Sequence, residues 1–200
     1  LSFGLDGLWR GAVAREVVRD EPRWVADVCT GTGDLGAAVA RRVNGRVHVI
    51  GIDFCEPMVR RGRAARGHGV RCVLADAEML PLADASVDAV CCAFGIRNVE
   101  DPTRAVAEMV RVLRPSGRVA VLEFCRPRGR VWRRIFGFYF QRVLPIVGWL
   151  VSGHRSAYRY LQASVARFEE PEETAGRFEA AGVEHVRVRR LLGGVVAMIS

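Results

Sequence analysis

The chain has 200 residues, 50% of them hydrophobic, and its 30 basic and 22 acidic residues give a net charge of +8. This length suffices for one hydrophobic core, so we expect a single domain over residues 1–200. Every basic residue is an arginine, which excludes Schiff-base chemistry, a lysine base and a P-loop lysine. The net charge indicates either an anionic partner, such as nucleic acid or acidic lipid, or simply an arginine-rich solvated surface.

The six cysteines form no C-x-x-C pair, and most lie in apolar, strand-like runs. We therefore expect buried free thiols in a reducing cytosol, not disulfides or metal ligands. The four histidines are dispersed along the chain, so neither a metal site nor a catalytic triad is predicted.

The first predicted element is an amphipathic helix over Leu5–Val18, which ends before Pro22. The sequence VADVCTGTGD (25–34) follows and is typical of a strand, a tight glycine turn and a helix start. Such a turn needs glycine because the backbone visits positive φ and because a Cβ would hold a ligand away from the peptide groups. We expect a small-molecule site here, with Asp27, Gly31, Thr32 and Gly33 as candidate cofactor-binding residues.

A second apolar strand, Arg46–Asp53, again ends on an acid, 20 residues beyond Gly33. At this position a nucleotide-binding α/β unit places a carboxylate that accepts both ribose hydroxyls. The alternative for Asp53 is a helix cap or a turn acid. In the helix that starts near Glu56, Met58 is either core filler or an apolar floor beside the ligand.

The third predicted strand is Val70–Leu74, and Asp76 after it is placed to accept a hydrogen bond from an exocyclic amine or to act as a cap. Val87–Phe94 is a fourth, buried strand, a helix covers Asp101–Leu113, and Arg118–Phe124 is a fifth strand. Strands that alternate with helices in this way predict an α/β fold, with a mostly parallel, doubly wound sheet between two helical layers.

The last predicted helix is Pro171–Ala181. The strands Val183–Leu191 and Val195–Ile199 follow, joined by Gly193 and Gly194, and they predict an antiparallel hairpin at the edge of the sheet. The predicted sheet then has seven strands.

Residues 126–168, after the fifth strand, read as an aromatic helical insertion or lid. Five arginines lie within 126–134, and eight of the sixteen aromatic residues lie between 132 and 160. Only Arg142 is charged in Ile135–His154, which is long enough for a membrane span, but Arg142 near its middle and Pro145 disfavour one. A helical lid, or a helix lying at a membrane surface, fits better.

Several motifs together resemble the ubiquinone/menaquinone biosynthesis C-methyltransferase family (UbiE/MenG type) of class I S-adenosylmethionine-dependent methyltransferases. They are FGIRNV (94–99), RVLRP (111–115), LEF (122–124) with Pro127, and YRYL (158–161). The resemblance covers essentially the whole chain and implies the Rossmann-like fold of that class. Family members begin further upstream, so we expect that this N-terminus is incomplete.

The resemblance implies S-adenosylmethionine as cofactor. Matched residue by residue, its contacts fall on Thr32 in the turn, on Asp53 for the ribose, and on Asp76 with Ala77 for the adenine end. Ala93 stands where some members have a serine, so one polar contact is absent. Cys29 stands at the first glycine position of the general turn, where the family tolerates a small residue.

The resemblance also implies methyl transfer to a ring carbon of a prenylated quinol, either demethylmenaquinol or a benzoquinol of ubiquinone biosynthesis. Arg97 is expected to stabilise the quinol oxyanion, the alternative being a loop salt bridge with Glu100 or Asp101. The proton acceptor stays open between a water oriented by Arg97 and the side chains of Tyr139, Tyr158 and His154.

The expected partner is thus a small-molecule quinol and not nucleic acid. We expect a cytoplasmic protein with peripheral contact at the inner face of the membrane, where the arginines of 126–134 meet anionic headgroups. The oligomeric state stays open, a homodimer included. The alternatives are a methyltransferase of another small molecule, a basic methyltransferase-like protein that binds nucleic acid, and a silent cofactor-binding module.

Overall fold

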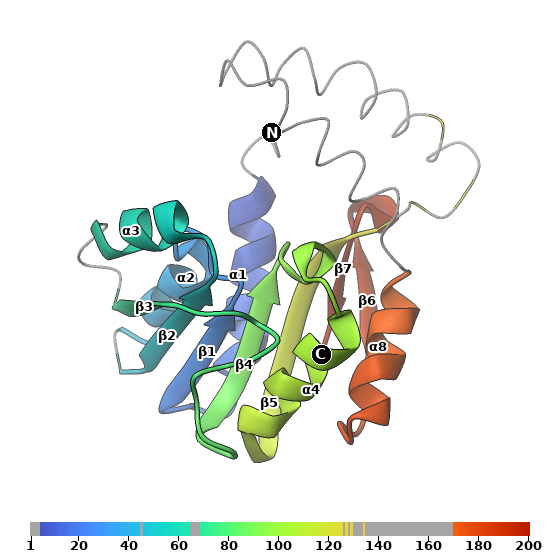
Figure 1. Cartoon of the computed structure of the whole chain (residues 1–200). Helices are drawn as coiled ribbons and strands as arrows, with labels where there is room; N and C mark the ends of the chain where they lie inside the picture. Colours follow the sequence, from blue (N-terminus) through green and yellow to red (C-terminus); the bar gives the residue numbers. More distant parts are fainter. Residues whose placement is uncertain are drawn as a thin grey trace.

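The computed structural model describes residues 5–44, 46–64, 69–125, 127, 129, 134 and 170–200. These residues form a sheet flanked by helices (Figure 1). In chain order the elements are α1 (Leu5–Val17), β1 (Trp24–Val28), α2 (Asp34–Arg42), β2 (His48–Asp53), α3 (Glu56–Ala64), β3 (Val70–Leu74), β4 (Val87–Ala93), η1 (Ile96–Asn98), α4 (Pro102–Val112), β5 (Leu113–Phe124), α8 (Pro171–Ala180), β6 (Val188–Leu191), η3 (Leu192–Gly194) and β7 (Val196–Ile199).

The described strands form one seven-stranded sheet in the order β3-β2-β1-β4-β5-β7-β6. Strands β1 to β5 pair in parallel, whereas β7 runs antiparallel to both β5 and β6. The chain therefore moves outward from β1 to β3 and then returns to β4 on the other side of β1. Such a reversal opens a crevice at the carboxyl ends of β1 and β4. The predicted doubly wound sheet and terminal hairpin are confirmed.

Two hydrophobic layers hold the sheet between its helices. Alternate strand residues point to opposite faces, so Val25 packs in the layer of α1 and α2, and Ala26 in the layer of α4 and α8. Cys91 and Cys92 divide between the same two layers. Figure 1 shows α1 and α2 behind the sheet and α4 and α8 in front of it. Burial on both faces explains why the strands read as continuous apolar runs.

The start of β5 differs from the prediction. The strand begins at Leu113, directly after α4, and not at Arg118. Its pairing with β4 shifts along the way, since Val87 lies opposite Leu113 but Ala89 lies opposite Arg118. The extra residues form a bulge in which Ser116 has a φ of 64°. Pro115 and Gly117 lie in this bulge and in the sequence are typical of the end of a helix. For this reason the sequence did not indicate that the strand begins before them.

The first strand of the hairpin is shorter than expected. It begins at Val188 and not at Val183, and His185 before it has a left-handed backbone with a φ of 57°. The Arg187 N–H still donates to the Ser200 carbonyl at 2.7 Å, and the Ser200 N–H donates to the Arg187 carbonyl at 3.0 Å. The alternation of valine and arginine therefore continues outside the strand.

The helix caps place the loops that surround the crevice. Asp101 caps α4, where its side chain accepts the N–H groups of Thr103 at 2.9 Å and Arg104 at 3.2 Å, and Pro102 occupies the first turn. Gly33 precedes α2 with a φ of 83°, a left-handed conformation that glycine adopts without strain. Both helices thus begin at the carboxyl edge of the sheet.

Candidate functional site

The turn after β1 lies at this crevice. Its backbone is left-handed at Cys29, Gly31 and Gly33, with φ values of 55°, 58° and 83°. The Thr30 N–H donates to the Ile52 carbonyl of β2 at 3.0 Å, and the Gly33 N–H donates to the Thr30 carbonyl at 3.0 Å. Three left-handed residues in five make the turn tight, and a Cβ on Gly31 would meet no atom within 4 Å, so the backbone is open there. Cys29 adopts this conformation although it is not a glycine, at an energetic cost.

Asp27 holds the turn from beneath. The side chain is 1% exposed, and its Oδ2 accepts the Thr30 hydroxyl at 2.5 Å and the Gly36 N–H at 2.8 Å. Burial raises the pKa of this carboxyl to about 6, although both hydrogen bonds and the Cys91 thiol lower it. Asp27 therefore fixes the shape of the turn and does not line the cavity in front of it.

Asp53 and Asp76 end the two neighbouring strands. The Asp53 carboxylate is 9% exposed and accepts the Gly31 N–H and the Cys55 N–H, both at 2.8 Å. Asp76 accepts the Glu78 N–H at 2.9 Å. Asp53 thus connects the glycine turn to the end of β2, while Asp76 shapes the loop after β3. The sequence left a capping or turn role open for both acids, and their hydrogen bonds are of this kind.

These residues border a cavity of about 270 Å³ at the carboxyl edge of the sheet. Its lining combines carboxylates with apolar side chains and one amide. The lining residues are Cys29, Ile52, Asp53, Phe54, Ala75, Asp76, Ala77, Glu78, Asn98, Val99 and Glu100. A lining of this composition suits a ligand with a flat apolar part and several hydrogen-bond donors.

Three predicted cofactor-binding residues, Asp53, Asp76 and Ala77, line this cavity together. The backbone of Gly31 reaches it through the hydrogen bond to Asp53. Thr32, Gly33 and Met58 do not line it, and Met58 lies on α3 with 42% of its surface exposed. The contacts of these residues with a cofactor stay predictions.

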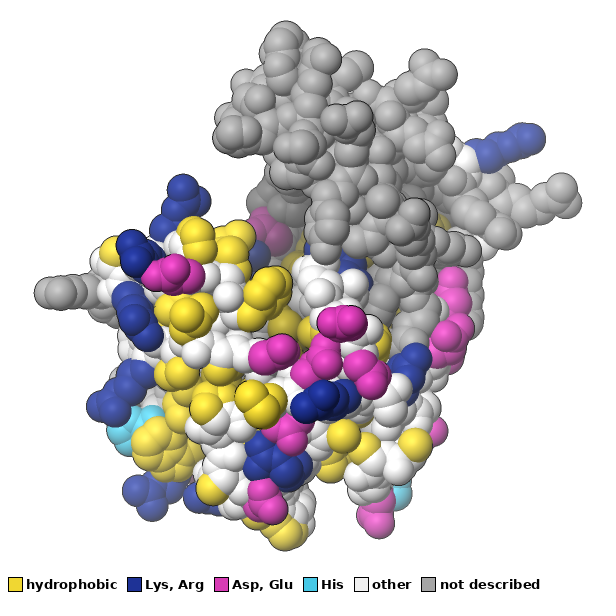
Figure 2. Space-filling view, in the orientation of Figure 1, with side chains coloured by type: hydrophobic (Ala, Val, Ile, Leu, Met, Phe, Trp, Pro, Cys, Tyr) yellow, Lys and Arg dark blue, Asp and Glu magenta, His cyan; other side chains and the backbone are white. Residues whose placement is uncertain are grey.

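Sequence reasoning missed the acidic rim of the cavity. Glu78 accepts the N–H groups of Glu100 and Asp101, each at 2.9 Å, so it ties the loop after β3 to the start of α4. Figure 2 shows acidic side chains gathered where these segments meet. The signal was present, since Glu78 lies two residues after Asp76 at a strand end. Carboxylates around a cavity mouth attract a cationic ligand.

Arg97 lies beside this cavity but forms neither of the ion pairs considered from the sequence. Its Nη1 lies 2.7 Å from Glu123 Oε1, and the two side chains are 8% and 2% exposed. The same Nη1 donates to the Phe94 carbonyl, and Glu123 Oε1 also accepts the Phe124 N–H at 2.9 Å. Burial raises the pKa of Glu123, and Arg97 partly offsets that effect.

A cluster of aromatic rings lies beside this ion pair. Phe94 and Phe124 stack with centroids 4.4 Å apart, and Trp9 of α1 meets Phe94 edge to face at 6.2 Å. The Arg97 guanidinium lies 5.6 Å from the centre of the Phe124 ring. The carboxyl edge over β4 and β5 is therefore an apolar wall with one buried pair of charges. The three aromatic residues are far apart in the sequence, so the sequence did not predict that they form a cluster.

Part of the predicted site lies outside the described residues. Tyr139, Tyr158 and His154 are among them, as is most of the insertion 126–168. Within the described part of the chain, no helix is long and apolar enough to cross a membrane, and no group of three or more His, Cys, Asp or Glu side chains could hold a metal ion. All six cysteines are free, and four of them, Cys72, Cys91, Cys92 and Cys125, are buried as expected.

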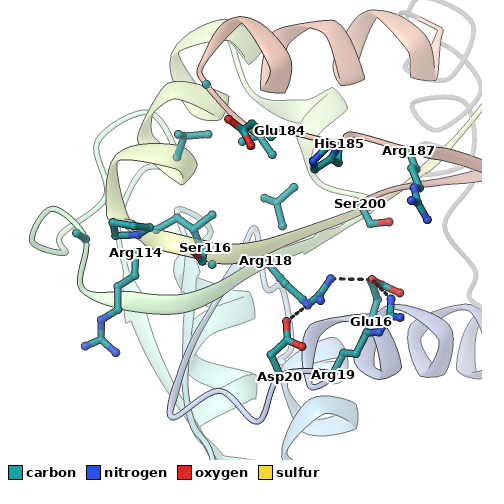
Figure 3. A pocket seen from close by; sticks show the side chains of 18 residues that line it. Glu16, Arg19, Asp20, Arg114, Ser116, Arg118, Glu184, His185, Arg187 and Ser200 are labelled. Atoms are coloured by element: carbon teal, nitrogen blue, oxygen red, sulfur yellow. Dashed lines mark hydrogen bonds and ion pairs between the residues drawn. The ribbon is translucent and has the colours of Figure 1, made fainter.

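A larger cavity of about 990 Å³ lies at the opposite, amino edge of the sheet (Figure 3). It lies between the end of α1, the bulge of β5 and the loop before β6. Arg118 pairs with Glu16 at 3.3 Å and with Asp20, and Arg114 pairs with Asp88. Much of its charge is thus balanced within the protein. We place the functional site at the smaller cavity, which has the strand-end carboxylates and the glycine turn.

Comparison with known proteins finds relatives over the whole chain. The model of the ubiE/COQ5 methyltransferase family matches residues 1–200. A demethylmenaquinone methyltransferase of Deinococcus radiodurans is 44% identical over 99% of this chain and 83% of its own length. The ubiquinone/menaquinone biosynthesis C-methyltransferase UbiE of Geobacter sulfurreducens is 40% identical over 99% of this chain and 79% of its own length.

Among solved structures, a S-adenosylmethionine-dependent methyltransferase of Thermotoga maritima, described as a possible histamine N-methyltransferase, superposes with a TM-score of 0.66. The match covers 98% of this chain and 91% of that one, at 22% sequence identity. At this identity the likeness shows the fold alone, and it confirms the predicted class of α/β fold.

Proposed function

Because the chain belongs to the ubiE/COQ5 methyltransferase family, we propose that it transfers the methyl group of S-adenosylmethionine to a ring carbon of a prenylated quinol. The acceptor is demethylmenaquinol, which becomes menaquinol, in keeping with the names of its relatives from Deinococcus radiodurans and Staphylococcus aureus. The observation that carries the proposal is the cavity at the carboxyl edge, where Asp53 and Asp76 meet beside the glycine turn.

The lining of this cavity fits S-adenosylmethionine. The ribose hydroxyls and the adenine amine are donors, and Asp53 and Asp76 offer carboxylate acceptors at two strand ends. The acidic rim with Glu78 and Glu100 complements a sulfonium cation. We propose that Ala77 and Met58 contact the adenine, that the backbone from Gly31 to Gly33, with Thr32, holds the methionine end, and that Asp27 supports this turn.

The bound cofactor supplies an electrophilic methyl group. A quinol ring carbon becomes a good nucleophile only when the neighbouring hydroxyl has lost its proton. We propose that Arg97, at the aromatic wall beside the cavity, stabilises this oxyanion. Being permanently protonated, it cannot itself take the proton. Tyr139, Tyr158 and His154, outside the described residues, stay the candidates for that role, together with a water molecule.

The partner is then a quinol from the membrane and not nucleic acid. We propose that the protein works in the cytoplasm, in peripheral contact with the inner face of the membrane. The net charge of +8 supports attraction to anionic headgroups. The arginines of 126–134 are the proposed contact.

Transfer of labelled methyl groups tests the proposal. The protein is incubated with labelled S-adenosylmethionine and either demethylmenaquinol or the corresponding methoxybenzoquinol, and the lipid extract is counted. We expect label in the naphthoquinol. Label in neither quinol would refute the proposed function, and label in the benzoquinol alone would refute the choice of acceptor.

Arg97→Ala tests the role of the arginine in the same assay. Loss of one group that stabilises a developing oxyanion typically lowers kcat by about 10²- to 10³-fold, and we expect a decrease of that size. Cofactor affinity, measured separately by calorimetry, should change little. Arg60→Ala is the matched control, because Arg60 is exposed on α3 and pairs only locally with Glu56 at 2.7 Å. Unchanged turnover in Arg97→Ala would refute the role.

A further inference from the structure

The ion pair of Arg97 and Glu123 joins the loop after β4 to the end of β5. Both side chains are buried, 8% and 2% exposed, at an N–O distance of 2.7 Å. Buried ion pairs seldom add stability over apolar residues of the same size, because the desolvation of both charges offsets their attraction. A buried pair at the carboxyl edge, where the acceptor is expected, therefore calls for an explanation other than stability.

Glu123 also fixes the conformation of this loop. The Arg97 guanidinium reaches from Glu123 to the Phe94 carbonyl, and Phe94 is held in a left-handed backbone with a φ of 59°. Asn98 and Val99, the next residues along the loop, line the cofactor cavity. A single carboxylate on β5 thus positions a loop that borders the cofactor on one side and presents Arg97 on the other.

The pair also sets the charge at the aromatic wall. The Arg97 side chain is 8% exposed and lies against the Phe124 ring, so a nearby anion interacts with it more strongly than in water. The negative charge of Glu123 already balances it at contact distance. An oxyanion formed beside Arg97 would have to share the same cation with Glu123. Its stabilisation therefore depends on the charge of Glu123 as well as on Arg97.

Among the described residues, the other groups around Glu123 leave this balance unchanged. On β4 the Cys92 thiol interacts with Glu123, but its hydrogen bond with Cys29 and its burial raise its pKa, so it stays neutral at physiological pH. On β7 the register partner of Glu123 is Ala197, which carries no charge. Arg97 is thus the charged group that contacts this carboxylate among the interactions described for it.

We propose that Glu123 is a positioning residue of the methyl transfer: it fixes Arg97 at the acceptor side of the site, and its negative charge sets the pH at which the bound acceptor hydroxyl loses its proton. This inference rests on the proposed role of Arg97 in quinol methylation. Glu123 does not contact the acceptor itself and acts through the guanidinium.

Glu123→Gln is the decisive variant. Glutamine has nearly the same shape and keeps one oxygen as acceptor for Arg97 and the Phe124 N–H, but it removes the charge. With the competing anion gone, Arg97 should stabilise the oxyanion better, so the acidic limb of the kcat–pH profile should move to lower pH by about one unit. The maximal kcat should change little, because glutamine keeps the oxygen that orients Arg97. A lower kcat with an unmoved limb would show a purely structural role and overturn the inference.

Asp88→Asn is the matched control for loss of a paired carboxylate. Asp88 pairs with Arg114 and accepts the Trp24 N–H at 2.8 Å, but it lies at the amino edge of the sheet. This variant should lose stability without moving the pH limb. If Glu123→Gln does not fold, Glu123→Asp replaces it: the charge stays while the reach is shortened, so kcat should fall and the limb should stay in place. A displaced limb in Glu123→Asp would overturn the inference.

A binding measurement separates this inference from the proposed function. 1-Naphthol is titrated spectrophotometrically while bound together with S-adenosylhomocysteine, because its ionisation changes its absorbance. The pKa of the bound naphthol should be about one unit lower in Glu123→Gln than in the unmodified protein, and higher in Arg97→Ala. If only Arg97→Ala changes the pKa of the bound naphthol, the role of Glu123 is overturned. The inference also fails if naphthol does not bind, or if neither variant changes its pKa. If naphthol behaves as expected but the unmodified protein methylates no quinol, only the proposed function is refuted.

Discussion

At the residue scale, the acid before the glycine turn shows how burial changes the meaning of a motif. Asp27 was predicted among the cofactor-binding residues, but its Oδ2 accepts the Thr30 hydroxyl and the Gly36 N–H beneath the turn. It holds the turn and the start of α2 in one arrangement. In the described structure Asp27 supports the turn, and a contact with the cofactor stays a prediction.

The buried carboxyl of Asp27 should give a measurable pH dependence of stability. Burial raises its pKa to about 6, above the value of about 3.9 of an unfolded chain. The native state therefore binds more protons than the unfolded state between these values, and the contribution to stability is present below about pH 4 and lost as the pH rises through 6. The difference between the two pKa values corresponds to a change of roughly 2 to 3 kcal/mol in the free energy of unfolding.

Asp27→Asn tests this dependence, since the asparagine oxygen can still accept both hydrogen bonds. The variant should gain roughly 2 to 3 kcal/mol relative to the unmodified protein between pH 4 and pH 7, as measured by urea unfolding at each pH. If the free energies of unfolding of the variant and the unmodified protein differ by the same amount at pH 4 and pH 7, the raised pKa of Asp27 is contradicted.

At the scale of elements, the close approach of the β1 turn to the loop before η1 defines the site. A Cβ on Gly95 would lie 2.2 Å from the Cβ of Cys29 and 3.1 Å from the sulfur atoms of Cys29 and Cys92. The ends of β1 and β4 cannot move apart without disturbing the sheet, because the two strands are paired. Only glycine fits here, although the sequence showed Gly95 merely as part of a family motif.

Two glycine-to-alanine variants check this packing. Gly95→Ala should lower the free energy of unfolding by about 1 to 3 kcal/mol, the usual effect of overpacking. Gly176→Ala is the control, because Gly176 lies within α8 and a Cβ there meets no atom within 4 Å. It should raise stability by about 0.5 to 1 kcal/mol through helix propensity. Equal effects of the two variants in urea unfolding would contradict the close approach.

At the scale of the whole molecule, charge is distributed unevenly. The rim of the cavity at the carboxyl edge is acidic, while the net charge of the chain is +8. The three arginines of α3, Arg60, Arg61 and Arg63, account for part of the excess, and Glu56 balances one of them through its pair with Arg60. The acidic rim suits the cationic cofactor, whereas the basic remainder suits an anionic surface.

Binding to vesicles tests the proposed membrane contact. The protein should sediment with vesicles that contain phosphatidylglycerol and not with pure phosphatidylcholine vesicles at low salt. Binding should decrease strongly between about 0.05 M and 0.5 M NaCl, because the Debye length shortens over this range. Equal binding to both vesicle types, or none to either, would refute electrostatic docking.

The sequence by itself determined the architecture, and it pointed to three acidic or small residues that border one cavity. The alternation of strands and helices indicated the doubly wound sheet, and chain direction then brought the ends of β2 and β3 to one edge. Asp53, Asp76 and Ala77 could be predicted because each lies at a strand end, a position that local pattern reveals. That residues 1–200 form one domain stays a prediction.

Only the tertiary structure decided how charges and rings combine at the acceptor side. Glu123 lies 26 residues after Arg97, and Trp9, Phe94 and Phe124 come from three separate segments. Such pairs depend on side-chain direction and burial at the meeting of strands, and hydrophobic periodicity contains neither. The same reason explains Asp27 and Gly95: their residue types were visible in the sequence, but the contacts that define their roles form only when β1, β2 and β4 lie side by side.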